Sequence, residues 1–193
     1  GYVVTNQIYS DGPVEAPILD IYGTSQTVSP TTGSGTFAGG VGIAKDLYVG
    51  GNMFVGGTVI FNAARENVEI IPNVAVSGND FDVDVLAGTI KYYTANAGSN
   101  WSPNFRGNAT VLLNDIMNVG ESLTLTTMVT QGDTAYYTGD VQIDGVYVTD
   151  TFWMGATPSE GNANGIDVYT YAIIKTAPYT YKVLAGLTNF VSV

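Results

Sequence analysis

The sequence predicts an all-β chain in which a short, glycine-rich β stalk precedes an antiparallel β-sandwich or jelly-roll-like domain. The 193 residues include 24 Gly and 13 Tyr, and long tracts rich in Val, Ile and Thr favour strands and turns over helices. A six-residue repeat lies within residues 34–65, and alternating apolar segments follow from residue 66 onward. We therefore predict three regions: an N-terminal arm (1–33), the stalk (34–65) and a C-terminal head domain (66–193).

The N-terminal arm contains short β-prone pieces that are interrupted by Pro13, Pro17 and Pro30. Because proline lacks the N–H that a sheet ladder needs, long regular strands are not expected there. Two interpretations stay open for residues 1–33. They form either a flexible arm or a docking segment that orders on a partner.

The stalk is predicted from three consecutive units, LYVGGN (47–52), MFVGGT (53–58) and VIFNAA (59–64). Each unit fits a three-residue strand with its first and third side chains on one face, and the first two end in a Gly-Gly corner able to adopt φ > 0. So small a repeat buries its apolar face only against neighbours, most simply other copies of the chain. The expected shared core is Leu47, Val49, Met53, Val55, Val59 and Phe61, and the expected corners are Gly50, Gly51, Gly56 and Gly57.

The head domain is predicted from five strand candidates separated by turn-forming residues. Asp-Gly within IDGV (143–146) favours a tight type I′ hairpin. Only LLNDIM (112–117) indicates a helix, and a short one. The strand candidates are DFDVDVL (80–86), SLTLTTMVT (122–130), TAYYTGDVQIDGVYV (134–148), IDVYTYAIIK (166–175) and YTYKVLAG (179–186).

The composition argues against most catalytic and binding chemistries. The chain has no His and no Cys, so Ser-His-Asp and Cys-His catalysis, thiolate zinc sites and disulfides are excluded. Neither a GxxxxGK[ST] loop nor a GxGxxG loop between a strand and a helix is present. The net charge of −11 disfavours nucleic acid and anionic membranes as partners, and no apolar run approaches the roughly 20 residues of a membrane span. We expect no enzyme activity and no cofactor.

Three acids alternate with apolar residues at Asp80, Asp82 and Asp84, which we call the Asp row. On a strand, their carboxylates lie along one face about 7 Å apart. The row is the most suggestive cation-binding pattern in the chain. The alternative, which we favour, is the solvated face of a half-buried strand.

Aromatic residues are concentrated in the head, where exposed rings beside Asn and Asp are suited to stacking on sugars. Most are expected to fill the core instead. Trp153, on a turn-rich flank, is the best candidate for a glycan contact, with Tyr136 and Tyr137 as further candidates. The aromatic set is Tyr92, Tyr93, Trp101, Tyr136, Tyr137, Tyr147, Trp153, Tyr169, Tyr171, Tyr179 and Tyr181.

Two parts of the sequence resemble structural and fibre proteins of tailed bacteriophages, especially those of marine cyanobacteria. GTFAGGVGIAKDLYVGGNMFVGGTV (35–59) resembles a recurrent stalk motif. A C-terminal module of the same group is similar to NWSPNFRG (100–107), LNDIMNVGESLTLTTMVTQGDTAYY (113–137) and GNANGIDVYTYAIIKT (161–176). Together these segments cover 74 of the 193 residues.

The resemblance implies a virion location and a trimeric, β-rich appendage, and it carries over no catalytic residues. On this basis we expect a non-enzymatic homotrimeric fibre or spike. Residues 1–33 would dock it to other virion proteins of the capsid or tail, and the head would adhere to the host surface, with a surface glycan as a candidate ligand. The alternatives are a capsid decoration protein or head fibre, and a carbohydrate-binding module with no role in a virion.

Overall fold

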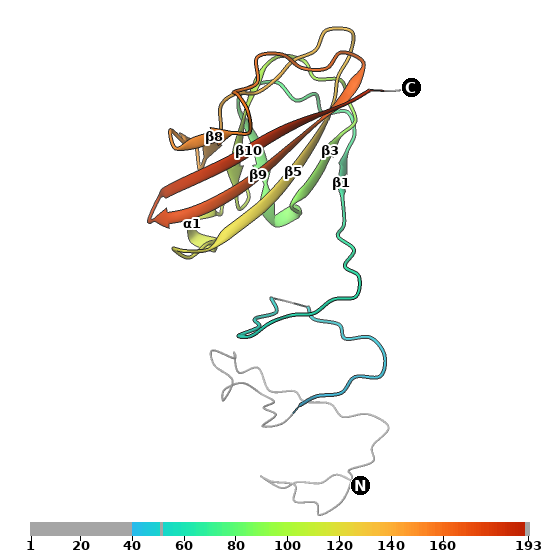
Figure 1. Cartoon of the computed structure of the whole chain (residues 1–193), viewed down its shortest axis with the longest axis vertical. Coiled ribbons are helices and arrows are strands. Elements are labelled where there is room, and N and C mark those ends of the chain that lie inside the picture. Colours follow the sequence, from blue (N-terminus) through green and yellow to red (C-terminus); the bar gives the residue numbers. More distant parts are fainter. Residues whose placement is uncertain (1–39, 51, 192–193) are drawn as a thin grey trace, which may run out of the picture. The chain divides into compact units, whose positions relative to one another are not determined.

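The computed structural model describes residues 40–50 and 52–191, and it divides the chain into two units, residues 1–60 and 61–193 (Figure 1). Strands dominate the second unit, so the largely β character expected from the sequence is confirmed. The described elements are β1 (Glu69–Ile71), β2 (Gly78–Asp84), the 3-10 helix η1 (Val85–Ala87), β3 (Ile90–Tyr93), β4 (Trp101–Arg106), α1 (Leu113–Ile116), β5 (Ser122–Thr130), β6 (Gln142–Ile143), β7 (Val146–Tyr147), β8 (Thr151–Trp153), β9 (Gly165–Ala177) and β10 (Thr180–Val191).

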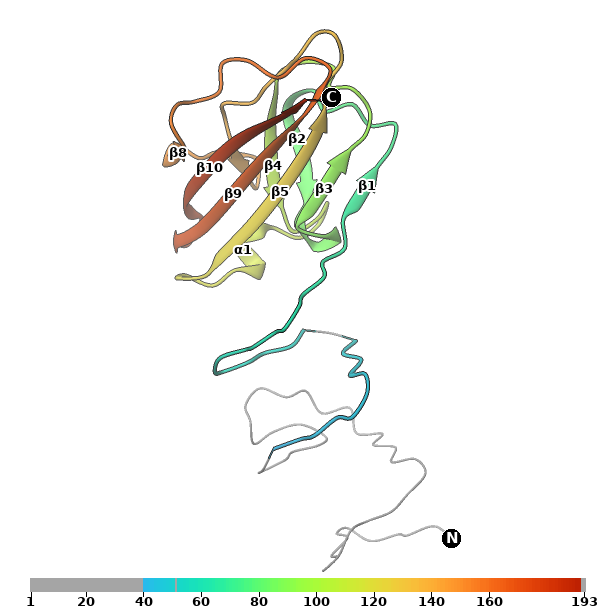
Figure 2. The same ribbon diagram turned by 45° about the vertical axis from the view of Figure 1, so that its right-hand side comes forward.

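The strands form a six-stranded sheet, β1-β3-β5-β9-β10-β8, and a four-stranded sheet, β2-β4-β6-β7. Figure 2 shows the four-stranded sheet behind the larger one. From β1 to β6 the chain alternates between the sheets, so neighbouring strands within each sheet run parallel. Five of the eight described strand pairings are parallel. The expected antiparallel pairing therefore applies only to β5-β9, β9-β10 and β6-β7, because each early crossover passes through the opposite sheet.

Aromatic contacts join the inner faces of the two sheets. The ring centroids of Trp101 and Tyr169 lie 5.4 Å apart, and those of Phe105 and Tyr171 lie 4.9 Å apart, both with edge-to-face geometry. Burial raises the pKa of the phenol at four tyrosines of this core, because the interior disfavours the charged phenolate. These core tyrosines are Tyr93, Tyr169, Tyr171 and Tyr181.

The predicted hairpin at residues 143–146 is confirmed. Asp144 and Gly145 lie between β6 and β7 with φ of 52° and 79°, and a type I′ turn needs positive φ at both positions. The Asp144 carboxylate also accepts hydrogen bonds from the first amides of α1, at 2.7 Å from Leu113 N and 3.0 Å from Asn114 N. The turn thus caps a helix that lies about 30 residues earlier in the sequence.

The opposite end of α1 is held by a buried lysine of β9. Lys175 is 5% exposed, and its ammonium donates to the carbonyl oxygens of Asn114 at 2.6 Å and Met117 at 2.8 Å. A four-residue helix has too few internal hydrogen bonds to be stable by itself. The caps from Asp144 and Lys175 explain why the predicted short helix forms at this place.

The described residues of the stalk, 40–50 and 52–65, contain no strand, so the three-residue strands expected there do not form within a single chain. Gly50, Gly56 and Gly57 also have no positive φ, and a Cβ on any of them would meet no atom closer than 3.9 Å. The corner geometry was expected for the assembled stalk of three chains, and for that assembly it stays a prediction. A strand this short acquires ladder partners only from another segment, and the described stalk residues offer none. Gly51 and the N-terminal arm lie outside the described residues.

Candidate functional site

The apolar side chains of the stalk repeat are exposed in a regular pattern. The second residue of each six-residue unit, which is the middle of the expected three-residue strand, is almost fully exposed, at 94% for Tyr48, 90% for Phe54 and 87% for Ile60. The six expected core residues, Leu47, Val49, Met53, Val55, Val59 and Phe61, are 41–66% exposed. Nine large apolar residues within fifteen positions are far more than the isolated exposed side chains of an ordinary surface. Residues 40–50 and 52–191 therefore provide no partner that covers this segment.

Figure 2 shows no strand or helix of residues 61–191 over the near face of the six-stranded sheet, which we call the outer face. Strand alternation and register assign one charged side chain to it, Lys182, among the described strand residues. Threonine, serine and apolar residues make up the rest. The outer face consists of Ile70, Ile90, Tyr92, Ser122, Thr124, Thr126, Met128, Thr130, Phe152, Ile166, Val168, Thr170, Ala172, Ile174, Thr176, Lys182, Leu184, Gly186, Thr188 and Phe190.

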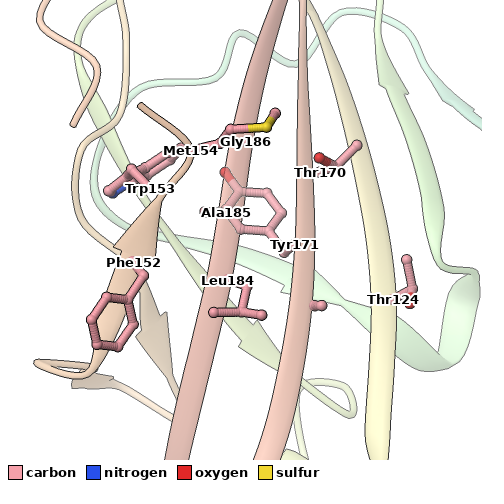
Figure 3. Close-up of a pocket in the computed structure, with 10 residues that line it drawn as sticks. Thr124, Phe152, Trp153, Met154, Thr170, Tyr171, Leu184, Ala185 and Gly186 are labelled. Atoms are coloured by element: carbon pink, nitrogen blue, oxygen red, sulfur yellow. The ribbon is translucent and has the colours of Figure 1, made fainter. Parts of the chain in front are cut away.

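A shallow hollow of about 430 Å³ lies on this face where β8, β9 and β10 meet (Figure 3). Leu184 and Phe152 stand beside it, and Met154 lies over Gly186, where a Cβ would come within 3.2 Å of the Met154 Cε. The ammonium of Lys182 lies over the Phe152 ring, 4.8 Å from the ring centroid. The hollow contains no described carboxylate, so it is suited to apolar side chains rather than to a cation.

A different cleft, of about 370 Å³, lies between the β6-β7 hairpin and the β9-β10 turn. Three of its lining residues, Tyr147, Tyr179 and Tyr181, are tyrosines, and we call it the tyrosine cleft. Tyr147 and Tyr179 are 49% and 68% exposed, and Tyr179 is held at φ 56°, an uncommon conformation for a bulky residue. Asp144 and Asp150 also line the cleft.

The third ring of the tyrosine cleft, Tyr181, is only 7% exposed, and its hydroxyl has no hydrogen-bond partner among the described residues. Burial raises its pKa to about 12, and the Asp144 carboxylate adds to the rise. The hydroxyl therefore stays protonated at neutral pH. Both Tyr147 and Tyr179 belong to the aromatic set noted in the sequence, but only the fold brings them together.

The structure gives two members of the Asp row a partner from the protein itself. Asp82 and Asp84 each form an ion pair of 2.6 Å with the guanidinium of Arg106, on the neighbouring strand β4. The hydrogen bond to Asp84 raises the pKa of Arg106. Asp80 departs from regular strand geometry, with φ of 61°, at the bulge between Gly78 and Phe81. Residues 40–50 and 52–191 contain no group of three acidic side chains placed to bind a metal.

Two of the three residues expected to contact a glycan, Trp153 and Tyr136, pack against the core. Trp153 is half-buried rather than exposed: its Nε1 donates to the Gly139 carbonyl at 3.0 Å, and its ring packs edge-on against Tyr169 and Tyr171. Tyr136 is half-buried and packs against the core. Tyr137 is half-buried too, and its backbone N donates to Asn100 Oδ1 at 3.1 Å. These rings offer sugars less open surface than those of Tyr147 and Tyr179.

The buried carboxylate of Asp167 plays a structural role. It lies on β9 and accepts hydrogen bonds from the side-chain amides of Asn189 at 2.6 Å and Gln131 at 3.0 Å, and from the backbone N–H of Asn162 at 3.1 Å. Burial raises its pKa, and these three hydrogen bonds oppose the rise. Because all three donors belong to the protein, this acid ties the ends of two long loops to the sheet.

Comparisons with protein-family models, with curated proteins and with solved structures find no match to this chain. In the part of the chain that the structure describes, none of the helices has the length and apolar character needed to cross a membrane.

Proposed function

We propose that this chain is a non-enzymatic structural protein of a tailed-phage virion, a homotrimeric fibre or spike with an N-terminal docking arm, a β stalk and a β-sandwich head for adhesion to the host. The observation that carries the proposal is the regular exposure of the stalk repeat in a single chain. Three copies would cover one another's apolar rows and supply the ladder partners that each short strand lacks. The resemblance to phage fibre proteins supplies the virion context and the number three.

Burial of the stalk residues supplies a favourable free-energy term for association. Each of the six core residues is roughly half-exposed, so burying the remainder contributes roughly 1 kcal/mol per side chain. The six together contribute on the order of 5 kcal/mol per chain, or on the order of 15 kcal/mol per trimer, before ordering costs. The three middle residues, Tyr48, Phe54 and Ile60, add to this sum if the assembled stalk covers both faces of each strand.

Analytical ultracentrifugation of the intact chain tests the proposal. We expect a trimer at micromolar concentration, and the double variant Val49→Asp, Val55→Asp should dissociate it, because association would bury unpaired carboxylates. The control Asn52→Asp, Thr58→Asp adds the same charge at the same six-residue spacing but outside the expected core. A monomeric wild-type protein would refute the model of the stalk. A Val49→Asp, Val55→Asp variant that stays as trimeric as the control variant would refute it as well.

A second function, a carbohydrate-binding module with no role in a virion, is favoured by the tyrosine cleft alone. Its exposed rings, Tyr147 and Tyr179, offer flat apolar faces for sugar C–H groups, and Asp150 offers hydroxyl acceptors. A glycan array decides between the two functions. Tight sugar binding by a monomer, lost in Tyr147→Ala with Tyr179→Ala, would support the module over the trimeric fibre.

A further inference from the structure

We propose that the outer face of the six-stranded sheet is the surface through which the head domains of three copies pack against one another. This inference rests on the homotrimer proposed above and extends it from the stalk to the head. The occupant of the face is thus a second copy of this chain.

The charge distribution identifies this face as a surface for self-association. Residues 66–193 carry thirteen acids and four bases, so two heads repel each other at most contact geometries. Acids of the strands that form the six-stranded sheet point away from the outer face: Glu69 pairs with Lys91, and Asp167 is fully buried. The face carries one charged strand side chain, Lys182, which pairs with Asp150 at 3.3 Å, so identical chains meet there with less charge repulsion than at the acidic surfaces.

The residues of the face have the composition of an interface core. Ile70, Phe152, Leu184 and Phe190 are 47–64% exposed, and half-buried apolar residues lie between them. Aromatic and other large apolar side chains are enriched, and charged side chains depleted, at the centres of protein interfaces. The hollow beside Leu184 and Gly186 adds a concave region that can receive a side chain from another copy (Figure 3).

The chain length between the two surfaces makes a modest head contact sufficient. Nine residues separate Phe61, the last core residue of the stalk, from Ile70 on the outer face, and nine extended residues span at most about 30 Å. Heads on a joined stalk therefore meet at an effective concentration on the order of millimolar. A basic partner protein would instead favour an acidic surface, and a membrane would favour a basic one, so neither fits this face.

Thiol labelling of the full-length protein tests the proposal, since the native chain has no cysteine. Thr170→Cys places one thiol at the centre of the face, and Thr134→Cys places one in an exposed loop as the matched control. In the trimer, we expect a maleimide to label the first thiol about tenfold or more slowly than the second, because a closed contact reacts only when it opens. In denaturant the two rates should be equal.

A second substitution in the same background checks that the protection comes from the head contact. Leu184→Lys adds charge to the face, and we expect it to remove the protection of the thiol from Thr170→Cys while the stalk keeps the protein trimeric. Val146→Lys, at a 68% exposed position on β7, should leave the protection intact. A trimer in which the two thiols react at one rate would overturn the head contact and leave the stalk standing. A monomer in the centrifuge would overturn both.

Discussion

Replacing Lys175 by methionine should strongly destabilise the head domain, because this buried side chain binds two carbonyl groups at the C-terminal end of the short helix α1. Its ammonium donates to the Asn114 and Met117 carbonyls at 2.6 and 2.8 Å, in a site that is 5% exposed. Hydrogen bonds from charged groups contribute about 1.5–3 kcal/mol each, and methionine would leave both carbonyls unpaired. Methionine carries no charge, so the desolvation penalty of the buried ammonium disappears and offsets part of that loss. We therefore expect the free energy of unfolding to fall by about 3 kcal/mol.

For a unit of residues 61–193, that cost corresponds to a fall of roughly 10 °C in Tm. Differential scanning calorimetry of the full chain measures it. The control is Lys45→Met, which removes the same charge from an exposed position outside this unit. Substitutions of exposed side chains usually change stability by about 0.5 kcal/mol or less, so the control should lose no more than about 3 °C. If the Lys175→Met protein has the same Tm as the control, Lys175 does not stabilise α1 in the way described.

Three further predictions concern the core tyrosines, the Asp row and the hairpin cap. Between pH 10 and 12 the urea midpoint should fall. Burial raises the pKa of each core tyrosine, so its hydroxyl keeps the proton in the folded state and loses it on unfolding. Each such tyrosine therefore lowers the free energy of unfolding by about 1.4 kcal/mol per pH unit above 10. Absorbance at 295 nm should show these phenols ionising only as the protein unfolds. Adding millimolar Ca²⁺ should leave Tm unchanged, since Arg106 already pairs with Asp82 and Asp84; a rise of several degrees, abolished by Asn at all three positions of the row, would contradict this. Asp144→Gly should cost about 1–2 kcal/mol in urea unfolding by removing the cap, and Asp144→Ala about 1 kcal/mol more because alanine disfavours φ of 52°. Equal losses would argue against strain at the turn.

The strands predicted best from the sequence are those with one buried and one exposed face. SLTLTTMVT matches β5 (Ser122–Thr130), whose burial alternates along most of its length. IDVYTYAIIK (166–175) falls within β9, and YTYKVLAG (179–186) begins one residue before β10 and covers its first seven residues. Period-two alternation is a local signal, so it identifies these strands without knowledge of their neighbours. The Asp-Gly hairpin was predictable for the same reason, because both positive-φ residues are adjacent.

The strand β4 was missed because both of its faces are buried. WSPNFR (Trp101–Arg106) has five consecutive buried residues, so no alternation marks it, and Pro103 argues against a central strand. The parallel order was missed for a related reason. It depends on crossovers between the sheets, and strand candidates separated by short turns read as consecutive antiparallel neighbours. The tyrosine cleft and the outer face are likewise products of long-range register.

The helix α1 shows where local sequence information ends. LLNDIM contains no side chain that caps its own first turn, and Leu112 occupies the N-cap position. Its two caps come instead from the two sheets: Asp144 belongs to the β6-β7 turn of the four-stranded sheet, and Lys175 belongs to β9 of the six-stranded sheet. Asp144 thus has a local role, in the hairpin turn, and a distant one, at the helix. Because the Asp144 carboxylate reaches Leu113 and Asn114 from the β6-β7 turn and the Lys175 ammonium reaches α1 from β9, both ends of the helix depend on the folded head.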